Sequence, residues 1–118
     1  TEEGKMEIMQ SVKTLAQGQF GEIDIVHKGS GTAKILEQDG KYYLRFENFT
    51  VTNGPDLYVY LSKSENPKET LGDYVNLGLL KGNTGNQNYE LPAEYLDYKT
   101  AVIWCKKFSV LFSFAVMK

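Results

Sequence analysis

Residues 101–117, AVIWCKKFSVLFSFAVM, decide the fold class of this sequence. Bulky side chains recur here at even-numbered positions: Val102, Trp104, Phe108, Val110, Phe112, Phe114 and Val116. Alternation with a period of two is typical of a β-strand with one buried side. The stretch therefore predicts a strand or strand pair whose even-numbered face packs in the core.

Two consecutive lysines, Lys106 and Lys107, interrupt this pattern and mark either a tight hairpin or a bulge. We favour the hairpin, because paired charges are disfavoured inside an apolar strand and suit an exposed turn. Cys105 would then end a strand close to the surface, where the lysines could stabilise a thiolate. In the bulged alternative the strand continues, and residues 27–31 cover Cys105 and bring His27 near the thiol.

Earlier residues form further strand-like runs separated by turns. Asp39-Gly40 separates the runs 33–36 and 42–51, and such a short turn is typical of a β-hairpin. The apolar positions change phase within 42–51, which predicts a bulge near Glu47-Asn48. We therefore expect the two runs to pair.

Residues 53–56, NGPD, give a dense turn signal. We expect a tight turn there, in which the side chain of Asn53 or Asp56 accepts backbone N–H bonds. Residues 57–61, LYVYL, then alternate: both tyrosines lie on one face, and the leucines and valine lie on the other. This run predicts a strand with one buried side.

The remaining segments are short. Residues 62–74 are interpreted as a surface loop, and 93–98 as one helical turn. Two short strands, 75–81 and 86–91, flank a turn at 82–85.

Eight or so short strands with frequent turns, in 118 residues, predict an all-β, single-domain antiparallel β-sandwich or small barrel. We divide the chain into an N-terminal extension or edge element, 1–17, and a β-domain, 18–118. Within the first part, residues 6–15 fit a short helix or an edge strand.

Charge argues against a nucleic-acid partner, and hydropathy argues against a transmembrane segment. Thirteen Lys and Arg against fifteen Asp and Glu give a net charge of -2 without a basic stripe, so no nucleic-acid partner is expected. The longest apolar region, 101–117, contains two lysines, so no transmembrane segment is expected.

One cysteine and one histidine leave few ways to build an active centre. Cys105 is the candidate redox thiol, and His27 is its only candidate base; the alternative is that Cys105 is a small buried core residue. Copper, zinc and calcium sites lack ligands here, so no metal or cofactor is expected. The glycine-rich segments 29–31 and 82–85 are interpreted as turns. An enzyme with an independent active site has the least support, since no catalytic triad can be composed.

Several stretches together resemble one family. They are HKGSGTA (27–33), LRFENF (44–49), NGPDLYVYLS (53–62), LKGNTGNQNYELP (80–92) and VIWCKKFSVLF (102–112). In this order they are similar to the electron-transfer DM-thirteen domain, from about residue 18 to residue 115.

The resemblance implies an extracytoplasmic domain (periplasmic, cell-surface or secreted), often carried on a membrane or lipid anchor as in a lipoprotein, and found beside DOMON and cytochrome-type domains. It places the single family cysteine, with its suggested redox role, on Cys105. Lys107 stands where the family has proline, and Ser109 where histidine is common, which removes a candidate partner of the thiol. Thr1 is not an initiator residue, so we expect that a preceding segment was removed.

The leading hypothesis is a redox or electron-transfer module that acts through Cys105 on a redox protein or cell-surface partner. The rival is a non-catalytic binding or interaction domain. Its candidate contacts are the loops 53–56 and 81–88 or a tyrosine-bearing sheet face, since the chain has eight tyrosines. The candidate binding-loop residues are His27, Asn53, Asp56, Asn86 and Gln87.

Overall fold

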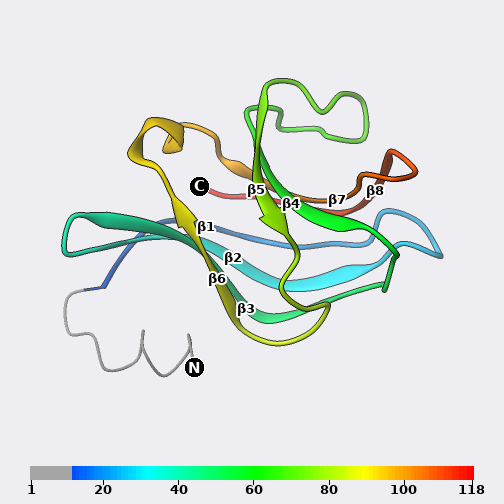
Figure 1. The fold of residues 1–118 in the computed structure, drawn as a ribbon, viewed down its shortest axis with the longest axis horizontal. Helices are drawn as coiled ribbons and strands as arrows, with labels where there is room; N and C mark the ends of the chain where they lie inside the picture. Colours follow the sequence, from blue (N-terminus) through cyan, green and yellow to red (C-terminus); the bar gives the residue numbers. More distant parts are fainter. Residues whose placement is uncertain (1–11) are drawn as a thin grey trace.

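Two four-stranded antiparallel sheets pack face to face in the structure, a computed structural model that describes residues 12–118 (Figure 1). Sheet A contains, in spatial order, β1 (Lys13–Gln19), β2 (Gly29–Gln38), β3 (Lys41–Val51) and β6 (Gln87–Leu91). Sheet B contains, in spatial order, β5 (Tyr74–Leu79), β4 (Leu57–Ser62), β7 (Thr100–Cys105) and β8 (Val110–Val116). The predicted all-β sandwich is confirmed, and within the described residues neither sheet closes into a barrel.

The predicted hairpin joins β2 to β3 through Asp39 and Gly40, whose φ angles are 51° and 79°. Positive φ at both central residues is the geometry that matches the twist of paired strands. The ladder shifts register between Ser30 and Thr32, opposite the predicted bulge at Glu47-Asn48, which is thereby confirmed.

The segment 29–31 is not the turn that we predicted. Gly29 begins β2, and Gly31 lies within the bulge with a φ of 108°. Glycine is needed there because the backbone of Asn48 and Phe49 comes too close for a side chain.

The core lies between the sheets and takes its side chains from both. In β4 it takes Leu57, Val59 and Leu61, while the two tyrosines of that strand lie on the opposite face, as predicted. From sheet A the largest fully buried core side chains are Ile35, Leu44, Phe46 and Phe49.

The face assigned to β7 was wrong. Ala101, Ile103 and Cys105 face the core, so Val102 and Trp104 point outward. A period of two identifies two faces, but both faces of this strand are apolar, so the pattern could not say which one is inside.

A bulge then reverses the parity in β8. Ile103 pairs with Ser113 and Trp104 with Leu111, which leaves Phe112 as the extra, buried residue. Beyond the bulge Ala115 faces the core and Phe114 does not. Phe108, expected in the core, is 60% exposed in the turn before β8.

Other segments follow the predicted order. Residues 63–73 form a loop, η1 (Ala93–Tyr95) is a short 3-10 helix, and the β7–β8 hairpin reverses at residues 106–109. The turn at 82–85 joins β5 to β6, but these strands lie in different sheets, so the connection passes from one sheet to the other.

At the N-terminal side, β1 is an edge strand of sheet A and crosses the boundary that we drew after residue 17. The rest of the predicted helix or edge strand at 6–15 lies outside the described residues.

Three connections meet at one end of the long axis: residues 20–28, 52–56 and 106–109 (Figure 1). The Ser113 hydroxyl donates to the carbonyl oxygen of Gly21, and the N–H of Lys106 donates to that of Asp56. We call these three segments together the loop end. It contains three of the predicted binding-loop residues: His27, Asn53 and Asp56.

Candidate functional site

The Cys105 side chain is 0% exposed and belongs to the core between the sheets. On its two neighbouring strands it pairs with Leu57 and Val110. Its sulfur has no hydrogen bond or ion pair within residues 12–118. The predicted hairpin forms, but the expected exposure of the thiol is wrong, because the odd-numbered side chains of β7 point inward. A redox role for Cys105 stays a prediction.

The two lysines of the hairpin contact aromatic rings and not the thiol. Lys106 Nζ lies 5.2 Å from the centroid of the Tyr58 ring, and Lys107 Nζ lies 5.5 Å from that of Phe108. Both contacts lie outside the core. Both ammonium groups thus lie on the solvent side of the sheet, and their contacts with the rings are cation–π interactions.

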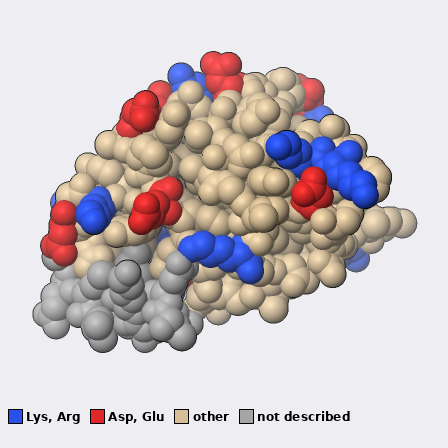
Figure 2. Space-filling model, viewed as in Figure 1, with Lys and Arg blue, Asp and Glu red and all other residues tan. Residues whose placement is uncertain are grey.

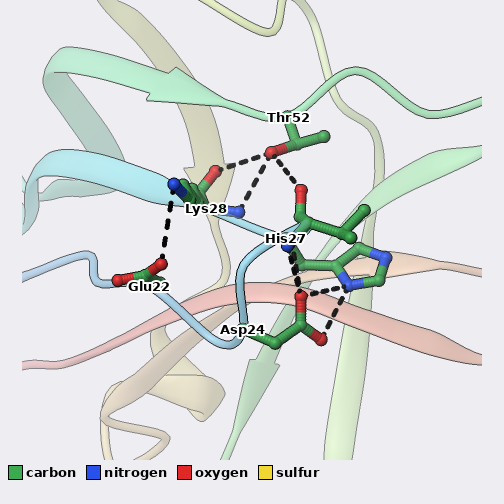
Figure 3. A network of polar contacts seen from close by, with 6 residues as sticks. Glu22, Asp24, His27, Lys28 and Thr52 are labelled. Atoms are coloured by element: carbon green, nitrogen blue, oxygen red, sulfur yellow. Dashed lines mark hydrogen bonds and ion pairs between the residues drawn. The ribbon is translucent and has the colours of Figure 1, made fainter.

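His27 is held in place by Asp24 (Figure 3). Asp24 Oδ1 lies 3.0 Å from His27 Nδ1, and it also accepts the backbone N–H groups of Val26 and His27. The hydrogen bond with the His27 side chain, followed by these two N–H groups, lowers the pKa of Asp24 from 3.8 to about 2. The imidazole also packs against the Phe112 ring, with 4.7 Å between the centroids.

Thr52 supplies the side-chain bonds that we expected from Asn53 or Asp56. Its Oγ1 accepts the N–H of Lys28 and donates to the carbonyl oxygen of Val26, each at 3.0 Å (Figure 3). Within the described part of the chain, neither the Asn53 nor the Asp56 side chain accepts a backbone N–H bond. The turn at 53–56 is present, but Thr52 holds it to the neighbouring loop.

Asn86 and Gln87 brace the connection between β5 and β6. Asn86 Oδ1 accepts the N–H of Asn48 at 2.7 Å, and Gln87 Nε2 donates to the carbonyl oxygen of Gly82 at 2.9 Å. Gln87 Oε1 accepts the hydroxyl of Tyr89. Both amides therefore have structural partners within the domain, and the structure does not bring them together with Cys105.

The outer side of sheet B carries a group of aromatic side chains that we call the aromatic face: Tyr58, Tyr60, Tyr74, Trp104 and Phe114. The Tyr60 ring stacks between two others, with centroid distances of 4.6 Å to Tyr74 and 6.3 Å to Trp104. Trp104 and Phe114 are half-buried, and Tyr74 is 49% exposed. The face thus combines a packed interior with rings that solvent reaches.

Burial and neighbouring groups keep the middle ring of this stack neutral. Burial, followed by the nearby Tyr74, Tyr58 and Asp56, raises the pKa of Tyr60 above its ordinary value of 10.0. The phenol therefore stays protonated at neutral pH.

Sequence reasoning identified only part of the aromatic face. The alternation in 57–61 predicted a shared face for Tyr58 and Tyr60, which the structure confirms. Trp104 and Phe114 were assigned to the core and are instead on the outside. Trp104 belongs to this face because β4 pairs with β7, which places Trp104 opposite Tyr58. The sequence pattern does not give strand order, so it could not predict this pairing.

Residues 12–118 contain no group of three or more His, Cys, Asp or Glu side chains arranged as metal ligands. In the same residues no helix is long and apolar enough to cross a membrane.

The fold and the site define a small all-β domain of the β-sandwich class, with an enclosed thiol and an aromatic outer face. Residues 19–117 match the family described as Electron transfer DM13, and the chain belongs to this family. The membership confirms the resemblance seen in the sequence and makes the chain an electron-transfer-associated domain. No curated protein and no solved structure matches the chain.

Proposed function

We propose that this chain is an extracytoplasmic docking module of an electron-transfer assembly, and that it binds a redox partner protein through the aromatic face. The observation that carries the proposal is the contrast between the enclosed sulfur of Cys105 and the aromatic side chains that solvent reaches on sheet B, of which Tyr74 is 49% exposed. The proposal thus takes the binding alternative and gives Cys105 a structural role.

Direct thiol chemistry needs a thiolate that a partner can reach. The Cys105 side chain is 0% exposed, and its strand neighbours Leu57 and Val110 are apolar. Neither the imidazole of His27 nor the hairpin lysines hydrogen-bonds to the sulfur in the described residues. A partner would have to open the sandwich before it could exchange electrons with this group.

The aromatic face, in contrast, has the composition of a protein interface. Tyrosine and tryptophan are enriched at interfaces because they offer large contact areas at little cost in side-chain entropy. Stacking on the buried Tyr60 already holds the rings of Tyr74 and Trp104, so these two rings lose little further freedom on binding. Redox complexes are typically small and transient, and one sheet face is large enough for such a contact.

The extracytoplasmic location is supported by family membership and is compatible with the state of the thiol. A lone exposed cysteine in an oxidising compartment would form intermolecular disulfides. Burial of Cys105 removes that risk.

Fluorescence provides a direct test, because Trp104 is the single tryptophan of the chain and lies on the aromatic face. The probes are two soluble c-type cytochromes, one acidic and one basic, whose haem quenches a nearby indole. We expect saturable quenching of Trp104 by at least one of them. Tyr74→Ser should weaken this binding, whereas Cys105→Ala should leave it unchanged.

Tyr43→Ser, a half-buried tyrosine of sheet A, is the matched control and should bind as the wild type does. Absence of saturable quenching with both cytochromes would overturn the proposal. So would binding or electron exchange that is lost in Cys105→Ala and retained in Tyr74→Ser, since that result would return the function to the thiol.

A further inference from the structure

The loop end exposes apolar side chains to an unusual degree. Ile25 is 86% exposed, Val26 62% and Phe108 60%, and these are three of the six large exposed hydrophobic side chains among the described residues. All three lie at the loop end, and exposed apolar groups that gather at one end of a domain are typical of a binding surface.

The loop that carries Ile25 and Val26 is closed by its own polar groups. The carbonyl oxygen of His27 accepts the N–H groups of Ile23 and Asp24, and Asp24 accepts those of Val26 and His27. Thr52, the residue after β3, then holds the base of the loop through its bonds to Lys28 and Val26 (Figure 3). These bonds fix the loop, which presents two aliphatic side chains to solvent, while the Asp24 carboxylate beside them stays about half exposed.

Three lysines, Lys28, Lys106 and Lys107, lie in the segments of the loop end, together with the carboxylates of Glu22, Asp24 and Asp56. Lys106 and Lys107 are exposed and form no ion pair within residues 12–118, whereas Glu22 pairs with Lys28 at 3.7 Å and Asp24 is hydrogen-bonded to His27. In Figure 2 charges of both signs are interspersed over much of the visible face, and a mainly positive group, with an acidic side chain among its members, lies at the end where the β7–β8 hairpin lies in Figure 1. Lys106 and Lys107, which have no carboxylate partner in residues 12–118, therefore lie at the same end of the domain as the apolar tips.

We infer that the loop end docks onto the surface of an anionic phospholipid membrane. Ile25, Val26 and Phe108 enter the boundary between headgroups and acyl chains, while Lys106 and Lys107 contact the lipid phosphates. This is the combination of buried apolar area and electrostatic attraction on which interfacial membrane binding depends. This surface adjoins the aromatic face at Lys106, whose ammonium group lies over Tyr58, but the inference does not rest on the proposed function.

The shape of the site favours lipid over a protein partner. The apolar groups stand on protruding loops at the end of the 40 Å long axis, where a protein would need a matching pocket for each tip. A lipid interface adapts to a convex surface. The long lysine side chains can also keep their stems on the apolar phase while their ammonium groups stay among the headgroups.

The test measures binding of the chain to sedimented vesicles of phosphatidylglycerol, with phosphatidylcholine vesicles for comparison. We expect binding to the anionic vesicles that weakens as salt is raised, and much weaker binding to the neutral ones. Ile25→Ser combined with Val26→Ser should reduce binding by about tenfold. Lys107→Glu should reduce it by about fivefold or more, because each lysine near an anionic surface contributes about that factor.

Two variants serve as matched controls: Leu79→Ser, because Leu79 is 61% exposed but lies on β5, and Lys41→Glu, because Lys41 begins β3 and the β2–β3 hairpin lies at the opposite end of the domain in Figure 1. Both should bind as the wild type does. In amide NMR spectra, anionic bicelles should perturb residues 22–28 and 106–109 selectively, and the spectra should also show that each variant is folded.

Three results would overturn the inference: equal binding to both vesicle types, binding that survives the Ile25→Ser/Val26→Ser change, or loop-end perturbations that depend on protein concentration without lipid. The last result would assign the surface to a second copy of the chain. Tyr74→Ser should bind vesicles normally, so failure of this inference and failure of the proposed function can be told apart.

Discussion

Gly31 and Asn48 lie against each other across the bulge between β2 and β3, and both have positive φ angles, 108° and 52°. A Cβ atom on Gly31 would come within 2.7 Å of the carbonyl oxygen of Asn48. The bulge therefore requires glycine for two separate reasons, a left-handed backbone and a close approach of main chains.

Gly31→Ala should lower the free energy of unfolding by roughly 2–4 kcal/mol, since it adds a backbone clash to the cost of positive φ. Gly78→Ala is the matched control, because Gly78 has nearly the same φ, 109°, and nothing within 4 Å of the added carbon. It should lose only about 1–2 kcal/mol. Urea denaturation measures both values. Equal losses would mean that the clash is relieved by movement of the strand.

Cys105 should behave as a core residue in stability measurements. Cys105→Ala removes a buried sulfur and should lower the free energy of unfolding by about 1–2 kcal/mol. Cys105→Ser leaves a hydroxyl without a partner and should lower it by about 1–3 kcal/mol more. The native thiol should react with a water-soluble disulfide reagent only as fast as the sandwich opens. Rapid labelling, together with a stable Cys105→Ser protein, would contradict the burial of the sulfur.

The sequence predicted the hairpin turns and the bulge well, because these features depend on residues that are neighbours in the chain. Asp39-Gly40 specified its hairpin because only a few residue types accept positive φ at both turn positions, and the lysine pair specified the β7–β8 hairpin. The change of phase near Glu47-Asn48 located a bulge that Gly31 completes from the other strand.

What could not be predicted depends on contacts between strands that are distant in the sequence. The direction of Cys105 depends on which side of β7 meets sheet A, and Ile103 is as apolar as Val102, so hydropathy is equal on the two sides. The aromatic face depends on the order of β5, β4 and β7 in sheet B. The pairing of His27 with Asp24 is local, but two apolar residues separate them, and no periodic pattern marks such a loop.

The buried guanidinium of Arg45 depends on Glu47. Arg45 Nε donates to Glu47 Oε2 at 2.8 Å, and Nη1 donates to Asn88 Oδ1 at 3.1 Å. Burial alone would raise the pKa of Glu47, but hydrogen bonds from Lys34 and Arg45 outweigh it and lower that pKa. Glu47→Gln removes the negative charge opposite the Arg45 side chain, which is 5% exposed. It should lower the free energy of unfolding by about 1–3 kcal/mol.

The control for this variant is Glu22→Gln. Glu22 Oε1 lies 3.7 Å from Lys28 Nζ, and both side chains are more than half exposed. The free energy of unfolding should therefore fall by less than about 1 kcal/mol. Thermal or urea unfolding of the two variants gives the comparison. A loss no larger for Glu47→Gln than for Glu22→Gln would mean that solvent replaces the carboxylate at Arg45.

The loop of residues 23–27 should open in acid at a pH that Asp24 determines. The folded loop favours the carboxylate form, because the His27 side chain and two backbone N–H groups bond to it and lower its pKa from 3.8 to about 2. The stabilisation is therefore complete above about pH 4, declines as the pH falls below the ordinary pKa, and is lost as the pH passes about 2. The amide signals of Val26 and His27 should report this transition in an NMR titration. Asp24→Asn should abolish it, Asp73→Asn should leave it in place, and a transition that persists in Asp24→Asn would show that another group controls the loop.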